Sequence, residues 1–439
     1  MELPAYQNVS WPLSLRDNRL LRYVTFFYLY VMQGIPAGFT LYALANYFSA
    51  EGLTSAAVGQ FVAVVGLPWA FQFIWGPIID KFQGSPMGRR RPWVLAAQSM
   101  AFVASLGILF VDDPVRQVGL LSAAFFVHSV FASVQDASVD ALAISVIPET
   151  ERGRINAFMR GGFLSGISMG AALLSYMLRE RGFFAAALTQ SALLLLLTGV
   201  TFFIKEKPGD SLLPGRTMPG RPDIHTEPRA HTLRWLFTEL FRGLLTRRSL
   251  LLFIPVLLYY TAQSIFNRAY SYHLIQRLGW ADTDVSVLQG TAGTLLILTI
   301  VLTGGVLADR FGAGRLLLWV MGFNVTCFLV FNGLNAFWDE PAVGRTGLVL
   351  WTMMDPIFSV ACMPLLMGLC RSHVEGSQFT AYMALVNLCD IAGAYLSGQA
   401  QMHLSAPTLG FLCGGLVLLA MVVAGRGLSV YSTASVGSQ

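Results

Sequence analysis

The chain has 439 residues, of which 55% are hydrophobic and only 12% are charged, and its mean hydropathy is +0.59. A soluble globular domain usually carries about 25% charged residues, so the composition excludes that class and predicts an all-α, multi-pass membrane protein. The net charge of +5 does not call for a nucleic-acid partner, because the positions of the basic residues along the chain explain it.

A transmembrane helix needs about 20 mostly apolar residues. Pro36 lies inside the first such segment and predicts a kink in that helix, because proline has no amide donor. The sixth and seventh segments are separated by a long polar stretch, so the chain divides into six spans and six spans. The twelve expected spans are 22–48, 54–80, 92–111, 117–147, 155–178, 183–204, 250–275, 283–308, 315–337, 345–370, 378–402 and 407–425.

These spans predict five consecutive regions. The central loop begins with a Pro- and Gly-rich stretch that predicts a disordered linker. It continues with an amphipathic pattern that predicts a helix on the membrane surface. The regions are an N-terminal tail (1–21), an N-terminal six-helix bundle (22–204), the central loop (205–249), a C-terminal six-helix bundle (250–425) and a C-terminal tail (426–439).

The basic residues predict the orientation. If the N-terminus is cytoplasmic, 22 of the 29 Lys and Arg residues fall on the cytoplasmic side and five fall outside. The other two, Arg160 and Arg268, lie inside spans. The positive-inside rule therefore predicts that both termini are cytoplasmic.

The two halves repeat a charged loop after their second span. Each copy has Gly-x-x-x-Asp, then a basic residue, then a glycine–arginine end. Short charged loops of this kind can lock and release the ends of helices, and a repeated six-helix unit is typical of transporters. The first copy contains Gly76, Asp80, Lys81, Gly88, Arg89 and Arg90, and the second contains Gly305, Asp309, Arg310, Gly312 and Arg315.

Twelve spans, a central loop and these two loops resemble the major facilitator superfamily. The longer first loop, residues 67–80 before it, the aspartates of the fourth span and PETERGR at 148–154 resemble the AmpG-like permeases of the peptide–acetyl-CoA transporter family. The resemblance implies a secondary transporter of a bacterial inner membrane. It implies proton-coupled import, by alternating access, of a polar anionic small molecule such as an anhydromuropeptide.

The resemblance also implies that helices 1, 4, 7 and 10 line a central cavity, while helices 2, 5, 8 and 11 form the moving interface. Other functions remain open: a ferric-siderophore permease, a small-molecule or drug exporter, or a non-transporting membrane assembly factor. The expected partners are a small-molecule substrate, protons and the lipid bilayer, and the chain is expected to be a monomer.

Neither an enzyme nor a metal or cofactor site is expected. The sequence has no HExxH motif and no paired cysteines, which are usual signs of metal chemistry. The five cysteines are expected to be buried packing residues. The absence of a Walker A sequence favours an ion gradient as the energy source.

The fourth span contains two aspartates, which are candidates for a functional role because inserting a carboxylate at the centre of a bilayer costs roughly 2.5–3.5 kcal/mol. Asp136 and Asp140 are four residues apart and share a helix face. We expect Arg160 to pair with Asp140 or with both, which leaves Asp136 as the candidate for proton coupling. The alternative is a structural network that holds helices 4 and 5 together.

Three further polar residues in the N-terminal half are candidates. His128 and Gln135 are seven residues apart and share a face of the fourth span, and Gln33 lies in the first span. A histidine titrates near physiological pH, so His128 could bind substrate or relay a proton. It could equally be a packed, hydrogen-bonded residue.

The seventh span is too polar for a helix that faces only lipid. Arg268 and Asp355 lie at similar depth, so an Arg268–Asp355 pair is the first expectation, with Asp390 as the alternative partner. Arg268 could bind a substrate carboxylate through its guanidinium or form a permanent internal salt bridge. The candidates of this half are Tyr260, Gln263, Asn267, Arg268, Asp355, Asn387 and Asp390.

Overall fold

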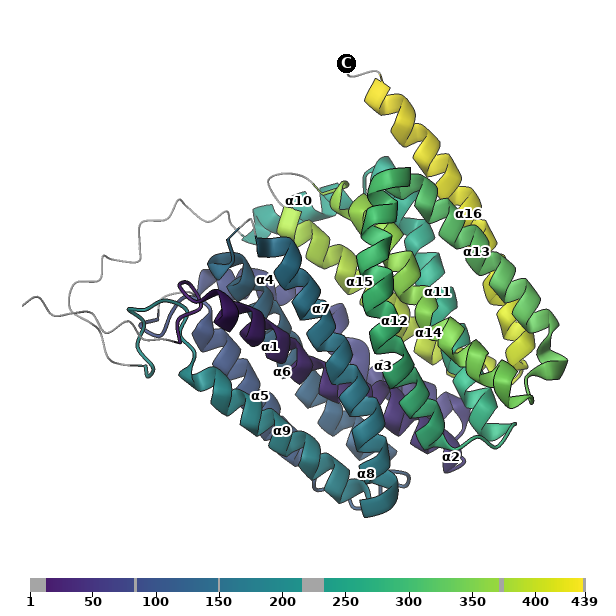
Figure 1. Cartoon of the computed structure of the whole chain (residues 1–439), viewed down its shortest axis with the longest axis horizontal. Coiled ribbons are helices and arrows are strands. Elements are labelled where there is room, and N and C mark those ends of the chain that lie inside the picture. Colours follow the sequence, from purple (N-terminus) through teal and green to yellow (C-terminus); the bar gives the residue numbers. More distant parts are fainter. Residues whose placement is uncertain (1–12, 83–84, 149–150, 215–232, 371–374, 437–439) are drawn as a thin grey trace, which may run out of the picture.

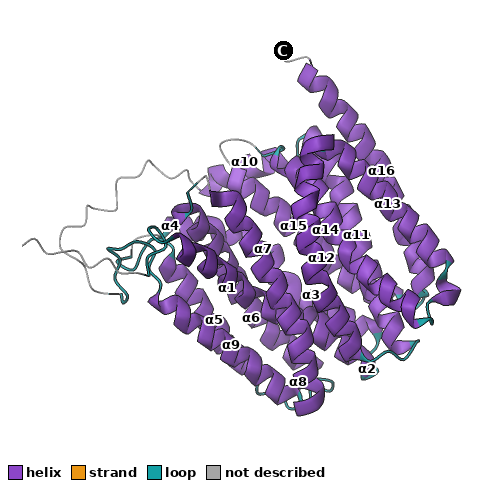
Figure 2. Cartoon of the chain, viewed as in Figure 1, coloured by secondary structure: helices purple, strands orange, loops and turns teal. Residues whose placement is uncertain are grey.

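The computed structural model describes residues 13–82, 85–148, 151–214, 233–370 and 375–436. Within these ranges the regular structure is helical, apart from one isolated β-bridge between Ser14 and Lys205 (Figure 2). The elements of the first half are α1 (Arg19–Gly38), η1 (Phe39–Leu44), α2 (Ala45–Ala50), α3 (Ser55–Ala70), η2 (Gln72–Ile74), α4 (Trp75–Lys81), α5 (Arg91–Ile108), α6 (Val118–Val146), α7 (Arg152–Ser168), η4 (Met169–Leu173), α8 (Leu174–Arg181) and α9 (Phe183–Phe203).

The second half has the same number of long helical passes as the first. A short helix, α10, precedes them. The elements are α10 (Leu233–Leu244), α11 (Arg247–Gln276), α12 (Asp282–Phe311), α13 (Ala313–Gly333), η5 (Asn335–Phe337), α14 (Pro341–Met367), α15 (Glu375–Ala400) and α16 (Ala406–Val436).

Several elements join end to end, so the described chain makes twelve helical passes, as expected. Ten passes are long and apolar enough to cross a membrane, and α5 and α12 are the other two. We call the elements from α1 to α9 the N-half and those from α11 to α16 the C-half. In Figure 1 the two halves form separate groups, and α3 lies against α15 where they meet.

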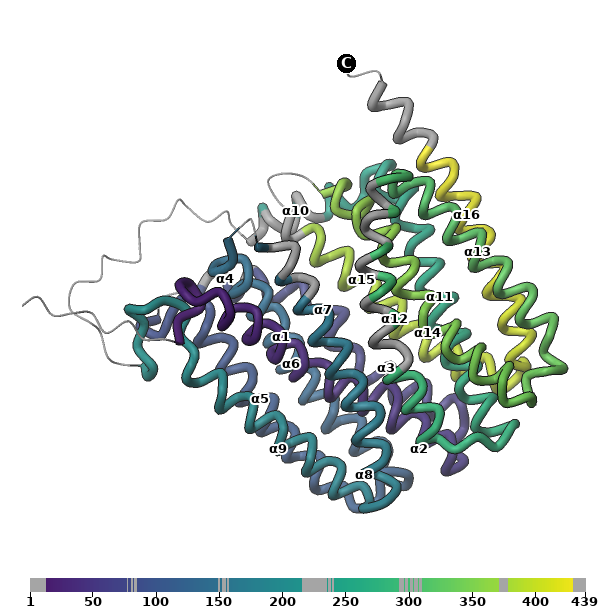
Figure 3. Tube along the Cα trace, in the orientation of Figure 1, coloured from purple at the N-terminus to yellow at the C-terminus, as the bar shows by residue number. Residues whose placement is uncertain are grey.

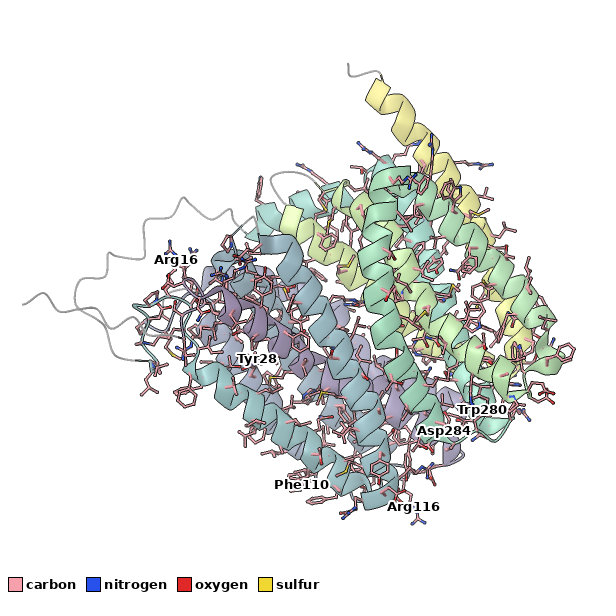
Figure 4. The ribbon with its side chains drawn as sticks, in the orientation of Figure 1. Arg16, Tyr28, Phe110, Arg116, Trp280 and Asp284 are labelled. Atoms are coloured by element: carbon pink, nitrogen blue, oxygen red, sulfur yellow. The ribbon has the colours of Figure 1, made fainter. Side chains whose placement is uncertain are left out.

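The two ends of the bundle differ in charge and in the elements that they carry. One end, here called the basic end, holds Arg16, Arg91 and the starts of α11 and α13. The opposite end holds Phe110, Arg116 and Asp284 (Figure 4). Each chain pass runs between these ends, as expected for a membrane-spanning bundle.

Glycines bring α1 and α7 into backbone contact. A Cβ atom on Gly34 would lie 2.8 Å from the Cα atom of Gly166, and a Cβ on Gly166 would collide with the carbonyl oxygen of Val31. Small residues at four-residue spacing allow such close approach. The two helices consequently run side by side along much of their length (Figure 3).

A kink is predicted at Pro36, and a π-helical segment begins three residues later. Thr40 in that segment, η1, donates to the carbonyl oxygen of Pro36 at 2.8 Å. A second π segment, η4, follows α7 and packs against η1. Because π segments are rare and often lie at functional sites, the contact between two of them indicates a functional region in this part of the N-half.

The start of the central loop is ordered, contrary to the predicted disordered linker. Glu206 is buried and accepts hydrogen bonds from the backbone amides of Arg90, at 3.0 Å, and Arg91. A carboxylate is favoured there because the amides at the start of α5 have no partners within the helix. Gly88 has φ of +119°, and a Cβ on it would lie 2.6 Å from Glu206 Oε2. The remainder of the predicted linker, 215–228, lies outside the described residues.

The helix predicted in the amphipathic stretch of the central loop is present as α10. The last helix, α16, continues to Val436, beyond the predicted end of the last span. Hydropathy marks where a segment becomes polar, whereas a helix can continue past that point.

We predict that Gly166→Ala destabilises the protein by roughly 1–3 kcal/mol, the usual cost of overpacking, because the added methyl group meets the backbone of α1. Gly199→Ala in α9 is the matched control, since a Cβ there meets nothing within 4 Å. Thermal unfolding of the two variants in detergent measures the difference. Equal unfolding midpoints would show that the α1–α7 contact tolerates a methyl group.

Candidate functional site

A cavity of about 350 Å³ lies between the two halves. It is lined by residues of η1, α2, α3 and α7 in the N-half and of α11, α12, α14 and α15 in the C-half. All of the predicted C-half candidates line it, together with one N-half candidate. They are Tyr260, Gln263, Asn267, Arg268, Asp355, Asn387, Asp390 and Arg160.

Arg268 pairs with Asp390, so the first-choice pair with Asp355 is wrong and the alternative is correct. The guanidinium donates to both carboxylate oxygens, at 2.9 and 2.8 Å, and also to Ser264 Oγ at 2.6 Å. The reason is helix packing: α15 lies directly against α11, where Ser264 Oγ donates to the backbone oxygen of Asp390. This bidentate geometry already occupies the face of Arg268 that would bind a carboxylate.

Arg160 and Asp355 face the central cavity from different halves. Among the described residues neither forms an ion pair, although the charge of Arg160 acts on Asp355 across the cavity. The Arg160 guanidinium lies 5.9 Å from the centre of the Phe163 ring. Besides the Arg268–Asp390 pair, the described lining of the cavity therefore presents one positive and one negative charge without an ion-pair partner.

The predicted pair between Arg160 and Asp140 is wrong. Asp140 accepts a hydrogen bond from Tyr30 of α1, and Asp136 accepts one from Gln72 of η2. Because α7 packs along α1, Arg160 is directed into the cavity while the aspartates of α6 meet other partners. In the described part of the chain, both carboxylates have uncharged hydrogen-bond donors and neither has a cationic partner.

A second cavity of about 170 Å³ adjoins the central one. Gln33 and His128 line it, so two of the remaining N-half candidates lie together. Gln135 lines neither cavity and is buried, with its Nε2 atom unpaired. Helix 4 therefore contributes His128 to the smaller cavity, in contrast to the central lining role that the resemblance implied for it.

The repeated charged loops lie at the basic end. In the first, Gly88, Arg89 and Arg90 adjoin the ordered segment around Glu206. In the second, Gly312 has φ of +83° and begins α13, while Arg310 and Arg315 are exposed. The other members are Gly76 in α4, the helical positions Asp80 and Lys81, and Gly305 and Asp309 in α12. We expect Asp80 and Asp309 to pair with basic residues near the ends of their helices, but their side chains lie outside the described ones.

Arg179 joins the two halves at the opposite end, and sequence analysis missed this role. Its guanidinium donates to Glu51 of the N-half at 2.6 Å and to Asp282 of the C-half at 2.9 Å. It also lies 4.6 Å from the centre of the Tyr47 ring. Arg179, Glu51 and Asp282 are here called the latch.

Further contacts between the halves gather near the latch. Asn46 donates to Ser286 Oγ at 2.9 Å and to Gln289 Oε1 at 3.0 Å, and Ser55 donates to the carbonyl oxygen of Gly398 at 2.8 Å. These bonds join α2 to α12 and α3 to α15. The halves are thus held together at the end of the bundle that lies opposite the basic end.

The sequence could have suggested the latch, but it could not have suggested the hydrogen-bond partners of Asp136 and Asp140. Arg179 and Asp282 are charged residues at the ends of the fifth and eighth passes, so their helix order could have suggested a contact. Tyr30 and Gln72 are single polar residues in apolar segments, and only the packing of α1 and η2 on α6 shows their role.

Comparison with known proteins supports this architecture. The family model described as Major Facilitator Superfamily matches residues 23–395. The anhydromuropeptide permease of Escherichia coli (strain K12) is 24% identical over 403 residues, which are 88% of this chain and 76% of that protein. Putative transporter AmpG 3 of Rickettsia prowazekii is 23% identical over 414 residues, which are 88% and 90% of the two chains.

A solved structure with a similar fold is the inward open conformation of the xylose transporter XylE from E. coli. Its TM-score is 0.66 at 12% identity, over 92% of this chain and 96% of that one. At this level of identity the likeness concerns the fold alone.

We predict that Arg179→Gln opens the opposite end more often. Removing a partly buried ion-pair network of about 1 kcal/mol shifts a conformational equilibrium roughly fivefold. The measurement is alkylation of Ser49→Cys, a buried position in the central cavity, by a membrane-impermeant reagent added on that side.

Arg116→Gln is the matched control, because Arg116 lies at the same end but pairs with Asp113 three residues before it. We expect a higher labelling rate for Arg179→Gln only. Equal rates in the two variants would show that the latch does not hold the halves together.

Proposed function

Because the chain belongs to the Major Facilitator Superfamily and is a multi-pass membrane transporter, we propose that it imports a polar anionic small molecule together with protons. An anhydromuropeptide is the favoured substrate class. The support for that class is the Escherichia coli anhydromuropeptide permease, which aligns with 88% of this chain. The membrane would be a bacterial inner membrane.

The charge distribution supports import into the cytoplasm. The basic end carries most of the Lys and Arg residues, so the positive-inside rule places it on the cytoplasmic side. The latch and its neighbouring bonds then close the periplasmic side. In this reading the structure is the inward-facing member of an alternating-access pair, and substrate release would occur at the basic end.

The observation that carries the proposal is the pair of uncompensated charges in the central cavity. Arg160 would bind a substrate carboxylate, since it has no carboxylate partner among the described residues. Asp355 would accept a hydrogen bond from an amino or hydroxyl group of the same substrate. Arg268 would instead hold α11 to α15 through Asp390. A peptide that bears both carboxylate and amino groups matches this arrangement.

The aspartates of α6 would couple transport to protons. Asp136 and Asp140 lie within a membrane-spanning helix and have only uncharged donors, Gln72 and Tyr30, as described partners. A carboxylate inside a membrane without a cation is favoured to exchange a proton. Asp136 is the preferred coupling residue.

We predict that purified protein in proteoliposomes accumulates labelled anhydromuropeptide when a proton gradient is imposed, and that an uncoupler abolishes this accumulation. Arg160→Gln should weaken substrate binding roughly tenfold to a hundredfold, because a hydrogen bond to a charged group contributes about 1.5–3 kcal/mol. Arg181→Gln, an exposed arginine at the end of α8, is the control and should bind normally.

Uptake of ferric siderophores instead of the muropeptide would show that the proposed substrate class is wrong and that the protein is still an importer. Efflux driven by the gradient would indicate an exporter. Absence of flux from correctly folded protein would favour a membrane assembly factor on the same fold.

A separate prediction concerns coupling. Asp136→Asn should retain exchange of substrate across the membrane but lose accumulation against a gradient, because an amide cannot release a proton. Asp284→Asn, at an exposed position at the opposite end, should behave like the unmodified protein. Accumulation by Asp136→Asn that still depends on pH would refute the role of Asp136.

A further inference from the structure

The second cavity, here called the side cavity, lies between the N-half and α15 of the C-half and adjoins the central one. It is lined by residues of α1, α3 and α6, among them Gln33, Trp69 and His128. Phe163, Asn387 and Asp390 line both cavities, so a single ligand can occupy the two together. The side cavity has about half the volume of the central one.

Two polar side chains in the side cavity lack partners. Gln33 is 4% exposed and its Nε2 atom has no hydrogen-bond partner, and His128 is 2% exposed and its Nε2 atom has none either. Buried polar groups are normally satisfied, and those that are not call for an explanation such as a missing ligand. Because both groups line the same cavity, one bound molecule could satisfy both.

The lining offers hydrogen bonds, and the charge of its carboxylate, Asp390, is already paired with Arg268. Asp390 is its only carboxylate, and both of its oxygens already accept from Arg268. The other polar lining side chains are the amides Gln33 and Asn387, the hydroxyls of Thr40 and Ser129, and His128. A charged ligand group would lose its hydration there without gaining a counter-ion, so an uncharged one is favoured.

The apolar part of the lining favours a ring. Trp69 lines the cavity, and the Phe125 ring lies 6.4 Å from the His128 ring, centre to centre. A sugar ring has an apolar C–H face that packs on an indole and hydroxyl or acetamido groups that exchange hydrogen bonds with amides and imidazole. Aromatic side chains that bury an apolar face beside polar groups suit such a ligand.

We propose that the side cavity is a subsite for an uncharged sugar ring, while the charged part of the same ligand occupies the central cavity beside Arg160 and Asp355. This inference rests on the proposed function, because it divides a sugar–peptide conjugate between two compartments. Gln33 and His128 are its binding residues.

Calorimetric titration of the purified full-length protein tests the subsite with three probes. They are an intact anhydromuropeptide, its anhydro-disaccharide part and its peptide part. The variants are Gln33→Leu and His128→Leu, which remove the unpaired groups and keep a side chain in the cavity. Gln98→Leu is the matched control, because Gln98 is also buried and unpaired but lines neither cavity.

The subsite predicts a specific pattern. Gln33→Leu and His128→Leu should each weaken binding of the disaccharide and of the intact ligand at least tenfold and leave binding of the peptide part unchanged. Neither variant should lower the thermal unfolding midpoint, because each removes a buried polar group that has no partner. Gln98→Leu should bind all three probes as the unmodified protein does.

Other results would overturn the subsite in distinguishable ways. Unchanged disaccharide binding in both variants, or an equal loss for the peptide part, would refute the subsite and leave the proposed function standing. Disaccharide binding that depends on Gln33, without transport of the intact ligand, would support the subsite and refute the proposed function. If the folded unmodified protein binds none of the probes, both are wrong.

Discussion

The close contact between α1 and α7 determines which charges this protein can use. Glycines allow the two backbones to touch, and this contact directs Arg160 of α7 into the central cavity. It also leaves the aspartates of α6 to the uncharged donors Tyr30 and Gln72. Had α7 packed its arginine on α6 instead, an ion pair would have neutralised both groups. The separation of these charges is therefore a consequence of backbone packing.

In the C-half, by contrast, an arginine and an aspartate do form an ion pair. Arg268 and Asp390 face each other across two directly packed helices, and Ser264 adds a further bond to each partner. The pair is bidentate and only partly buried, since the Asp390 side chain is 48% exposed. The pair thus fixes α15 to α11 and leaves Asp355 as the accessible acidic group of the cavity. One half provides a free cation and the other a free anion.

Sequence reasoning identified the fold and most cavity residues, but not their pairing. The twelve passes and the polar seventh helix follow from hydropathy, because burial in lipid imposes a long apolar run. Arg268 with Asp355 was chosen on depth alone, whereas the observed partner depends on which helix is the neighbour. The latch was missed for a related reason: Arg179, Glu51 and Asp282 are distant in sequence, and only the meeting of the halves brings them together.

The first pass connects the separate parts of the candidate mechanism. Along one continuous helical path it places Tyr30 beside Asp140, Gln33 in the side cavity, and Asn46 in the bonds that join the halves. Gln33 also lies close to the carboxylate of Asp136. A ligand that engages Gln33 therefore changes the surroundings of a carboxylate. Because the π segment η1 interrupts the same path between Gln33 and Asn46, the helix has a place where its two ends can move relative to each other.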